Sequence, residues 1–102
     1  MVEEIKRLCG EGAFVLTSHA VDRLLERNIS QDEVLEAIAS GEVIEDYPND
    51  YPFPSMLLYG NGIHVVCALC EYSGKPIAAI VTAYRPSIDR WEPDMRTRRK
   101  NQ

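Results

Sequence analysis

The chain has 102 residues, enough for one domain with a real hydrophobic core and too few for two. Its apolar fraction of 45% and charged fraction of 26% are typical of a water-soluble globular protein. No apolar run approaches the roughly 20 residues that span a bilayer, and the first residues lack the basic and apolar regions of a signal peptide. We therefore expect one cytoplasmic domain over residues 1–102, not bound to a membrane.

Charge is distributed unevenly along the chain, whose formal net charge is −5. Residues 85–102 carry a net charge of +3, and the remaining residues carry −8. An acidic body argues against nucleic-acid binding, but a basic tail leaves RNA binding open. Residues 86–102 also contain two prolines, so we expect a basic, partly flexible tail that is mostly loop with at most a short helix.

The first part of the chain has the pattern of two helices separated by a short extended piece. Residues 2–10 place apolar side chains at helical spacing and end at a glycine. Residues 13–16 are the extended piece. A second helix is predicted over about residues 19–28, with Thr17 and Ser18 as N-cap candidates and no proline or glycine to interrupt it.

A third helix is predicted over residues 31–40. Ser30 and Glu33 have the spacing of a capping box, in which each side chain accepts a hydrogen bond from the other residue's backbone N–H. An apolar face follows, and Gly41 ends the pattern. This helix therefore has both a start signal and a stop signal.

The second half of the chain predicts strands joined by tight turns. Asn61-Gly62 and Ser73-Gly74 are two-residue hairpin signals. The expected strands are residues 42–47, at an edge because of their charges, and residues 55–60, 63–71 and 76–84, with a proline-rich loop over 48–54. Because the last two strands lack polar alternation, both of their faces should be covered. We therefore predict an α+β domain, in which N-terminal helices pack on a small antiparallel β-meander.

The helix predicted at residues 19–28 has one polar face. At about 100° per residue, His19, Arg23, Glu26 and Arg27 fall within roughly a quarter turn, opposite the aliphatic residues. An imidazole and two guanidinium groups on one face are compatible with a catalytic surface. They are equally compatible with an ordinary solvated face.

The hairpin turns predict which residues lie opposite each other in the sheet. A two-residue turn at Asn61-Gly62 pairs Tyr59 with His64, and the second turn then sets His64 opposite Ala83. Candidate residues near this end of the sheet divide between its faces: Tyr59, His64 and Arg85 on one, Thr82 and Tyr84 on the other. For His64 alone we favour a structural role, as a histidine whose ring is satisfied at a strand end.

Three cysteines, Cys9, Cys67 and Cys70, are predicted to be buried structural thiols. Cys67-x-x-Cys70 has a spacing seen in metal sites, but residues three apart on a strand point to opposite faces. The sequence has no second such pair. We therefore expect no metal site and no cofactor.

Taken together, these motifs make the sequence resemble a family labelled domain of unknown function 4258. The matching segments are Ser18-His19-Ala20-x-x-Arg23-x-x-x-Arg27-x-Ile29, Gly41-Glu42-Val43-Ile44, a Tyr-Pro segment and Thr82-Ala83-Tyr84. That family resembles a branch of the RelE-like (MqsR/BrnT-like) toxin superfamily, whose small α+β members are often metal-independent endoribonucleases. Members commonly occur beside a zinc-finger antitoxin of the MqsA (YgiT) type.

The resemblance implies the toxin of a type II toxin–antitoxin system, which cleaves mRNA through attack of the 2′-hydroxyl. His19, Arg23 and Tyr84 are the matching positions for catalysis. The remaining polar candidates are assigned to substrate binding: Arg27, Thr82, Arg85, His64 and Tyr59. The implied partners are RNA and the zinc-finger antitoxin.

The residue types fit such a reaction, which needs proton transfer and stabilisation of the phosphorane charge. His19 can exchange protons, Arg23 can bind phosphate oxygens in a fork, and Tyr84 can donate a hydrogen bond or stack on a base. In the simplest structural alternative, Arg23 pairs with Glu26 or a carbonyl oxygen and His19 caps the helix. In the functional alternative, the chain is a catalytically inactive toxin-fold module that acts by binding a protein partner.

Overall fold

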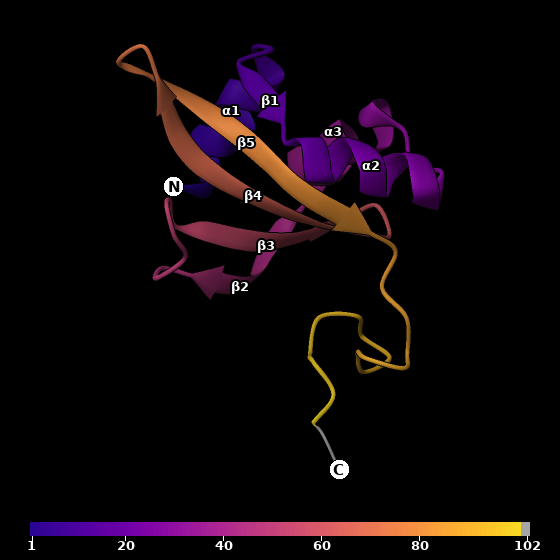
Figure 1. Ribbon diagram of the computed structural model, residues 1–102. Coiled ribbons are helices and arrows are strands. Elements are labelled where there is room, and N and C mark those ends of the chain that lie inside the picture. The colour runs from indigo at the N-terminus through magenta and orange to yellow at the C-terminus, as the bar shows by residue number, and fades with distance from the viewer. Residues whose placement is uncertain (101–102) are drawn as a thin grey trace.

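Three helices and a five-stranded mixed sheet make up the computed structural model, which describes residues 1–100 (Figure 1). The α+β class predicted from the sequence is confirmed. Among the described residues, no helix has the length and apolar character needed to cross a membrane. In chain order the elements are α1 (Val2–Gly10), β1 (Phe14–Leu16), α2 (Ser18–Arg27), α3 (Gln31–Ser40), β2 (Glu42–Tyr47), β3 (Ser55–Gly60), β4 (Ile63–Tyr72) and β5 (Lys75–Tyr84).

The sheet has the order β1-β5-β4-β3-β2. β2 to β5 form the predicted antiparallel meander, and the charged strand β2 lies at one edge, as expected. The extended piece before α2 adds a fifth strand, β1, which runs parallel to β5 at the other edge. Pairing with β5 gives the backbone groups of this short segment the partners that they need once buried.

Both ends of α2 and the start of α3 are capped by side chains or by backbone geometry. Thr17 Oγ1 accepts a hydrogen bond from the N–H three residues on, and Asn28 ends α2 in the left-handed region with φ of 55°. The predicted capping box is present, with the Glu33 N–H donating to Ser30 Oγ at 3.0 Å and the Ser30 N–H donating to Glu33 Oε1 at 2.9 Å. Local sequence signals therefore determine where these helices begin.

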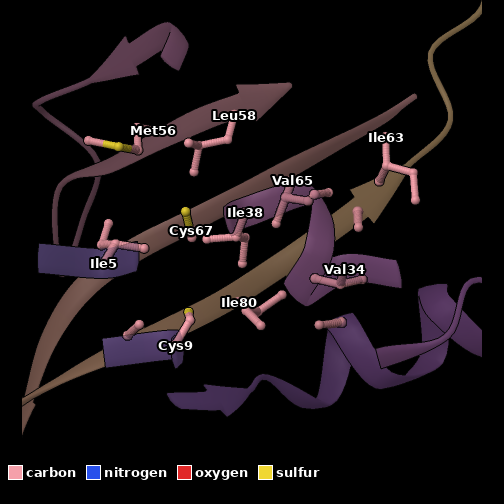
Figure 2. Close-up of a cluster of buried hydrophobic side chains, with 14 of the residues drawn as sticks. Ile5, Cys9, Val34, Ile38, Met56, Leu58, Ile63, Val65, Cys67 and Ile80 are labelled. Carbon is pink, nitrogen blue, oxygen red and sulfur yellow. The ribbon is translucent and has the colours of Figure 1, made fainter. Parts of the chain in front are cut away.

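The hydrophobic core lies between the helices and one face of the sheet (Figure 2). This core includes four fully buried aliphatic side chains from the two layers: Ile5 of α1, Ile38 of α3, Val65 of β4 and Ile80 of β5. Each such aliphatic side chain stabilises the fold by about 1.5–3 kcal/mol relative to an exposed position. This core holds the helices on one face of the sheet.

The cysteines are divided between the two faces of the sheet. Cys9 and Cys67 belong to the buried core on the helix side, and burial raises the pKa of the Cys67 thiol to about 12. Cys70 lies on the opposite face and is only half-buried, so the expectation of three buried thiols is wrong for this residue. Cys70 lies near the end of β4, close to the turn that leads into β5.

The segment after β5 folds back onto the end of the sheet. Trp91 is 2% exposed and contacts the ring of His64, with 4.4 Å between ring centroids. Within the described part of this segment, residues 86–100, there is no helix. The last two residues of the tail predicted to be partly flexible, 101–102, lie outside the described residues.

Candidate functional site

α2 lies along the part of β5 that no strand covers. β1 pairs with β5 only as far as Ile80, which leaves the following backbone of β5 at an open edge. The Thr17 N–H donates to the Ile80 carbonyl oxygen at 3.1 Å, and Thr17 Oγ1 donates to the Val81 carbonyl oxygen at 3.2 Å. At the other end of α2, Arg27 Nη1 donates to the Ala83 carbonyl oxygen at 2.9 Å. α2 is thus held to β5 at both of its ends.

His19, Arg23 and Arg27 form a line along α2, because a spacing of four residues returns to the same side of a helix. His19 and Arg27 are exposed, and Arg23 is half-buried. Arg27 Nη1 also donates to Thr82 Oγ1 at 3.3 Å, which joins one end of this line to β5. Arg27 is thus the member of this line that contacts the end of β5.

Arg23 is partly satisfied by its own helix. Its Nη1 lies 2.8 Å from Glu26 Oε2, the ion pair foreseen in the structural alternative. Its Nε is buried and has no hydrogen-bond partner within the described residues. Because this Nε is buried, the part of the Arg23 guanidinium that faces outward is its Nη end, which is paired with Glu26.

Tyr84 connects the α2 line to the interior of the sheet. The Arg27 guanidinium carbon lies 6.0 Å from the centroid of the Tyr84 ring, at the outer limit of a cation–π contact. Tyr84 Oη lies 3.3 Å from His64 Nδ1, and burial raises the pKa of the Tyr84 phenol. The phenol therefore stays protonated at neutral pH.

His64 is fully buried and both of its ring nitrogens have partners. Its Nε2 lies 2.7 Å from the Met95 carbonyl oxygen, which can only accept, so Nε2 carries the proton and Nδ1 accepts from the Tyr84 hydroxyl. The Tyr59 ring contacts it edge-on, with centroids 5.1 Å apart. Burial is the main cause that lowers the pKa of His64, against the hydrogen bond to Met95. This geometry supports a structural role.

The predicted register is correct at both turns, where Tyr72 pairs with Lys75, and wrong only beyond Cys67 of β4. Tyr59 pairs with His64 as expected, but His64 pairs with Tyr84 rather than Ala83. A β-bulge at Val81 shifts the pairing by one residue, because Val66 lies opposite Thr82 and the next residue of β4 lies opposite Ile80.

The bulge reverses the predicted division between the two faces of the sheet. Tyr84 shares a face with Tyr59 and His64, not with the core residues of β4. Arg85 instead binds the helices, with Nη1 donating to the Arg27 carbonyl oxygen at 3.1 Å and Nη2 lying 3.1 Å from Glu33 Oε2. Arg85 therefore joins the end of α2 to the start of α3 and is separated from His64.

Arginines of the C-terminal segment contribute to this end of the sheet, which the sequence reasoning missed. Arg98 Nη2 lies 2.8 Å from Glu45 Oε1, and its guanidinium carbon lies 4.6 Å from the Trp91 ring centroid. Arg96 pairs with Glu42. The opposite net charges of tail and body were the signal that could have predicted this docking.

No group of three or more His, Cys, Asp or Glu side chains suited to hold a metal ion occurs within residues 1–100. The described site thus consists of an imidazole, guanidinium groups, hydroxyls and aromatic rings. These groups can bind phosphate, stack on a planar ring and transfer a proton.

A family model described as a domain of unknown function, DUF4258, matches residues 16–85, which is more than half of the chain. The chain belongs to the DUF4258 family. The DUF4258 match begins at the end of β1 and reaches Arg85, so it includes all of the site residues predicted from the sequence. Helix α1 and the C-terminal segment that covers His64 lie outside it. Comparison with curated proteins and with solved structures finds no match.

Proposed function

We propose that this DUF4258 chain is the RNA-cleaving toxin of a type II toxin–antitoxin pair, an endoribonuclease that needs no metal ion. The observation that carries the proposal is the line of His19, Arg23 and Arg27 on α2, whose last member, Arg27, contacts Thr82 and Tyr84 of β5. The resemblance to RelE-like toxins supplies the reaction class, and a zinc-finger antitoxin of the MqsA type is the proposed partner.

In this reaction the RNA 2′-oxygen forms a bond to phosphorus and the P–O5′ bond breaks, which leaves a 2′,3′-cyclic phosphate and a 5′-hydroxyl. One proton leaves the 2′-hydroxyl and one reaches the 5′-oxygen. His19 is exposed and free to exchange these protons, while Arg23 and Arg27 stabilise the charge on the phosphorane oxygens. Tyr84 holds its ring beside Arg27.

A catalytically inactive binding module is the second candidate, and specific contacts favour it. Arg23 is already paired with Glu26, and the Tyr84 hydroxyl already has an acceptor in His64 Nδ1. In this case the α2 surface binds the protein partner and RNA is not cleaved. One assay distinguishes the two functions. The purified chain is incubated with mixed RNA in the presence of EDTA, and only the nuclease should cleave the RNA.

Two variants test the assignment of roles. His19→Ala should reduce the rate of RNA cleavage by about a hundredfold, the usual contribution of a general acid or base. Arg23→Lys should cause a loss of similar size, because an ammonium group cannot reproduce the planar fork of donors. Both variants should keep the wild-type melting temperature, since His19 is exposed and lysine retains the charge and stem of Arg23.

Arg7→Lys is the matched control, because Arg7 pairs with Glu4 on its own helix as Arg23 does with Glu26, but lies on α1. It should cleave RNA at the wild-type rate. Undiminished cleavage by His19→Ala would defeat the proposed mechanism. A large drop in melting temperature with Arg23→Lys would show instead that Arg23 mainly stabilises the packing of α2.

A further inference from the structure

The face of the sheet opposite the helices carries an apolar groove with a cavity volume of about 310 Å³. Its floor is formed by small side chains on two neighbouring strands, Val66 and Ala68 of β4 and Ala79 of β5. The loop between β2 and β3 forms a wall with Tyr51 and Phe53. A volume of this size is at the lower end of the range for small-molecule sites.

The lining favours a flat, uncharged ring over a charged group. Tyr51 is 95% exposed and Phe53 is 39% exposed, so two aromatic side chains stand at the groove without being used by the core. Asp50 lies in the same wall, where its Oδ2 accepts a hydrogen bond from Ser55 Oγ. A carboxylate there repels phosphate, whereas a nucleobase can stack on the aromatic rings and offer N–H donors to the carboxylate.

The groove and α2 share a residue. Thr17 lines the groove and caps α2, two residues before His19. On the floor, Val66 lies directly opposite Thr82, the residue that accepts a hydrogen bond from Arg27. A single strand whose phosphates contact the arginines of α2 can therefore place a neighbouring base in the groove.

We propose that this groove is a base-binding subsite for single-stranded RNA, in which Tyr51 stacks on a nucleobase next to the bond to be cleaved. The inference rests on the proposed function, because it takes RNA to be the substrate of the α2 surface. It also gives a role to the loop over residues 48–54, which no other part of the site uses.

Binding is measured separately from cleavage with a fluorescently labelled, mixed-sequence RNA strand whose riboses are 2′-O-methylated, so that no 2′-hydroxyl can attack. Tyr51→Ala should raise its Kd about fivefold or more, since one base–aromatic stack is worth about 1–3 kcal/mol. Tyr51→Phe should bind like the wild type because the ring is kept. The matched control is Tyr72→Ala, which removes another exposed tyrosine, 74% exposed and not part of the groove.

An abasic strand of the same length tests what the groove recognises. The wild type should bind it at least about tenfold more weakly than the base-containing strand. Tyr51→Ala and the wild type should bind it equally. Equal binding of both strands by the wild type, or an unchanged Kd for Tyr51→Ala, would overturn the base subsite.

Cleavage of unmodified RNA in EDTA, measured in parallel, separates the two proposals. If RNA binding depends on Tyr51 but RNA is not cleaved, the nuclease proposal is wrong and the base subsite is supported. If RNA is cleaved and Tyr51→Ala has no effect on cleavage, the nuclease proposal is supported and the base subsite is wrong. A wild-type chain that neither binds nor cleaves RNA would overturn both.

Discussion

Tyr84 and His64 are opposite each other in the sheet, and their hydrogen bond limits what each can do. Because His64 Nε2 donates to the Met95 carbonyl oxygen, Nδ1 is the acceptor that the Tyr84 hydroxyl meets. The Tyr84 hydroxyl can therefore donate a hydrogen bond to RNA only if its hydrogen bond to His64 Nδ1 is broken. Its ring remains beside Arg27, so the contribution that the geometry favours is to position the Arg27 guanidinium.

The buried, neutral His64 makes stability depend on pH. Burial lowers its pKa in the folded chain, so below about pH 6.5 the unfolded chain takes up a proton that the folded chain does not bind. The contribution of neutral His64 to the free energy of unfolding is therefore fully present above about pH 6.5. It is lost as the pH falls from there toward the lowered pKa of the folded chain. Of the nearby charges, Glu45 opposes this shift and Arg98 adds to it.

We expect the free energy of unfolding in urea to fall between pH 7.5 and pH 5.5 in the wild type, and to fall less in His64→Gln. His19→Ala is the control, because it removes the exposed histidine and should keep the wild-type pH dependence. An identical decline in His64→Gln and the wild type would contradict the assignment of this pH dependence to His64.

The C-terminal segment and β2 have complementary chemistry. Glu45 is half-buried and Arg98 binds it, and this hydrogen bond is the main cause that lowers the pKa of Glu45. Next to this pair, burial together with the hydrogen bond to Glu45 raises the pKa of Tyr47 to about 12. Exposed ion pairs contribute little, so Trp91 should contribute most to holding the segment in place.

Trp91→Ala should lower the free energy of unfolding by about 3 kcal/mol, within the range for truncation of a buried tryptophan. Ile88→Ala is the control, because Ile88 belongs to the same segment and is 58% exposed; its effect should stay within about 0.5 kcal/mol. Urea unfolding monitored by circular dichroism measures both. A loss below about 1 kcal/mol for Trp91→Ala would mean that the segment is held weakly.

Two glycines, Gly41 and Gly60, allow α3 and the sheet to pack closely against each other. A Cβ at Gly60 would lie against the Ala37 carbonyl oxygen of α3 and 2.8 Å from the Cα of Gly41. The obstructing atoms belong to the backbone and cannot move without shifting α3. The backbone at the end of α3 thus packs directly on the backbone of β3 and of the residue before β2. There is no room at this contact for a side chain larger than the hydrogen atom of glycine.

Gly60→Ala should therefore destabilise the fold by about 3 kcal/mol, as overpacking against rigid atoms does. Gly10→Ala is the matched control, since nothing lies within 4 Å of a Cβ at the last residue of α1 and alanine favours a helix. Thermal unfolding of both variants compares the two sites directly. A Gly60→Ala chain as stable as the wild type would contradict the close packing of α3 on β3.

The sequence by itself determined the elements and the class of the fold. Capping residues before α2 and α3, the Asn61-Gly62 and Ser73-Gly74 turns and the apolar strands depend on neighbours a few residues away, so local patterns predict them. The polar face of α2, with His19 and Arg23, followed from helical periodicity in the same way.

Only the tertiary structure decided what surrounds that face. The bulge at Val81 moved Tyr84 to the His64 face, β1 joined the sheet, and Trp91 closed over His64. Each of these contacts joins segments distant along the chain. These contacts are stabilised by side-chain packing, by charge pairing and by hydrogen bonds of backbone groups. Such interactions form only once the chain has folded, so a local sequence pattern does not predict them.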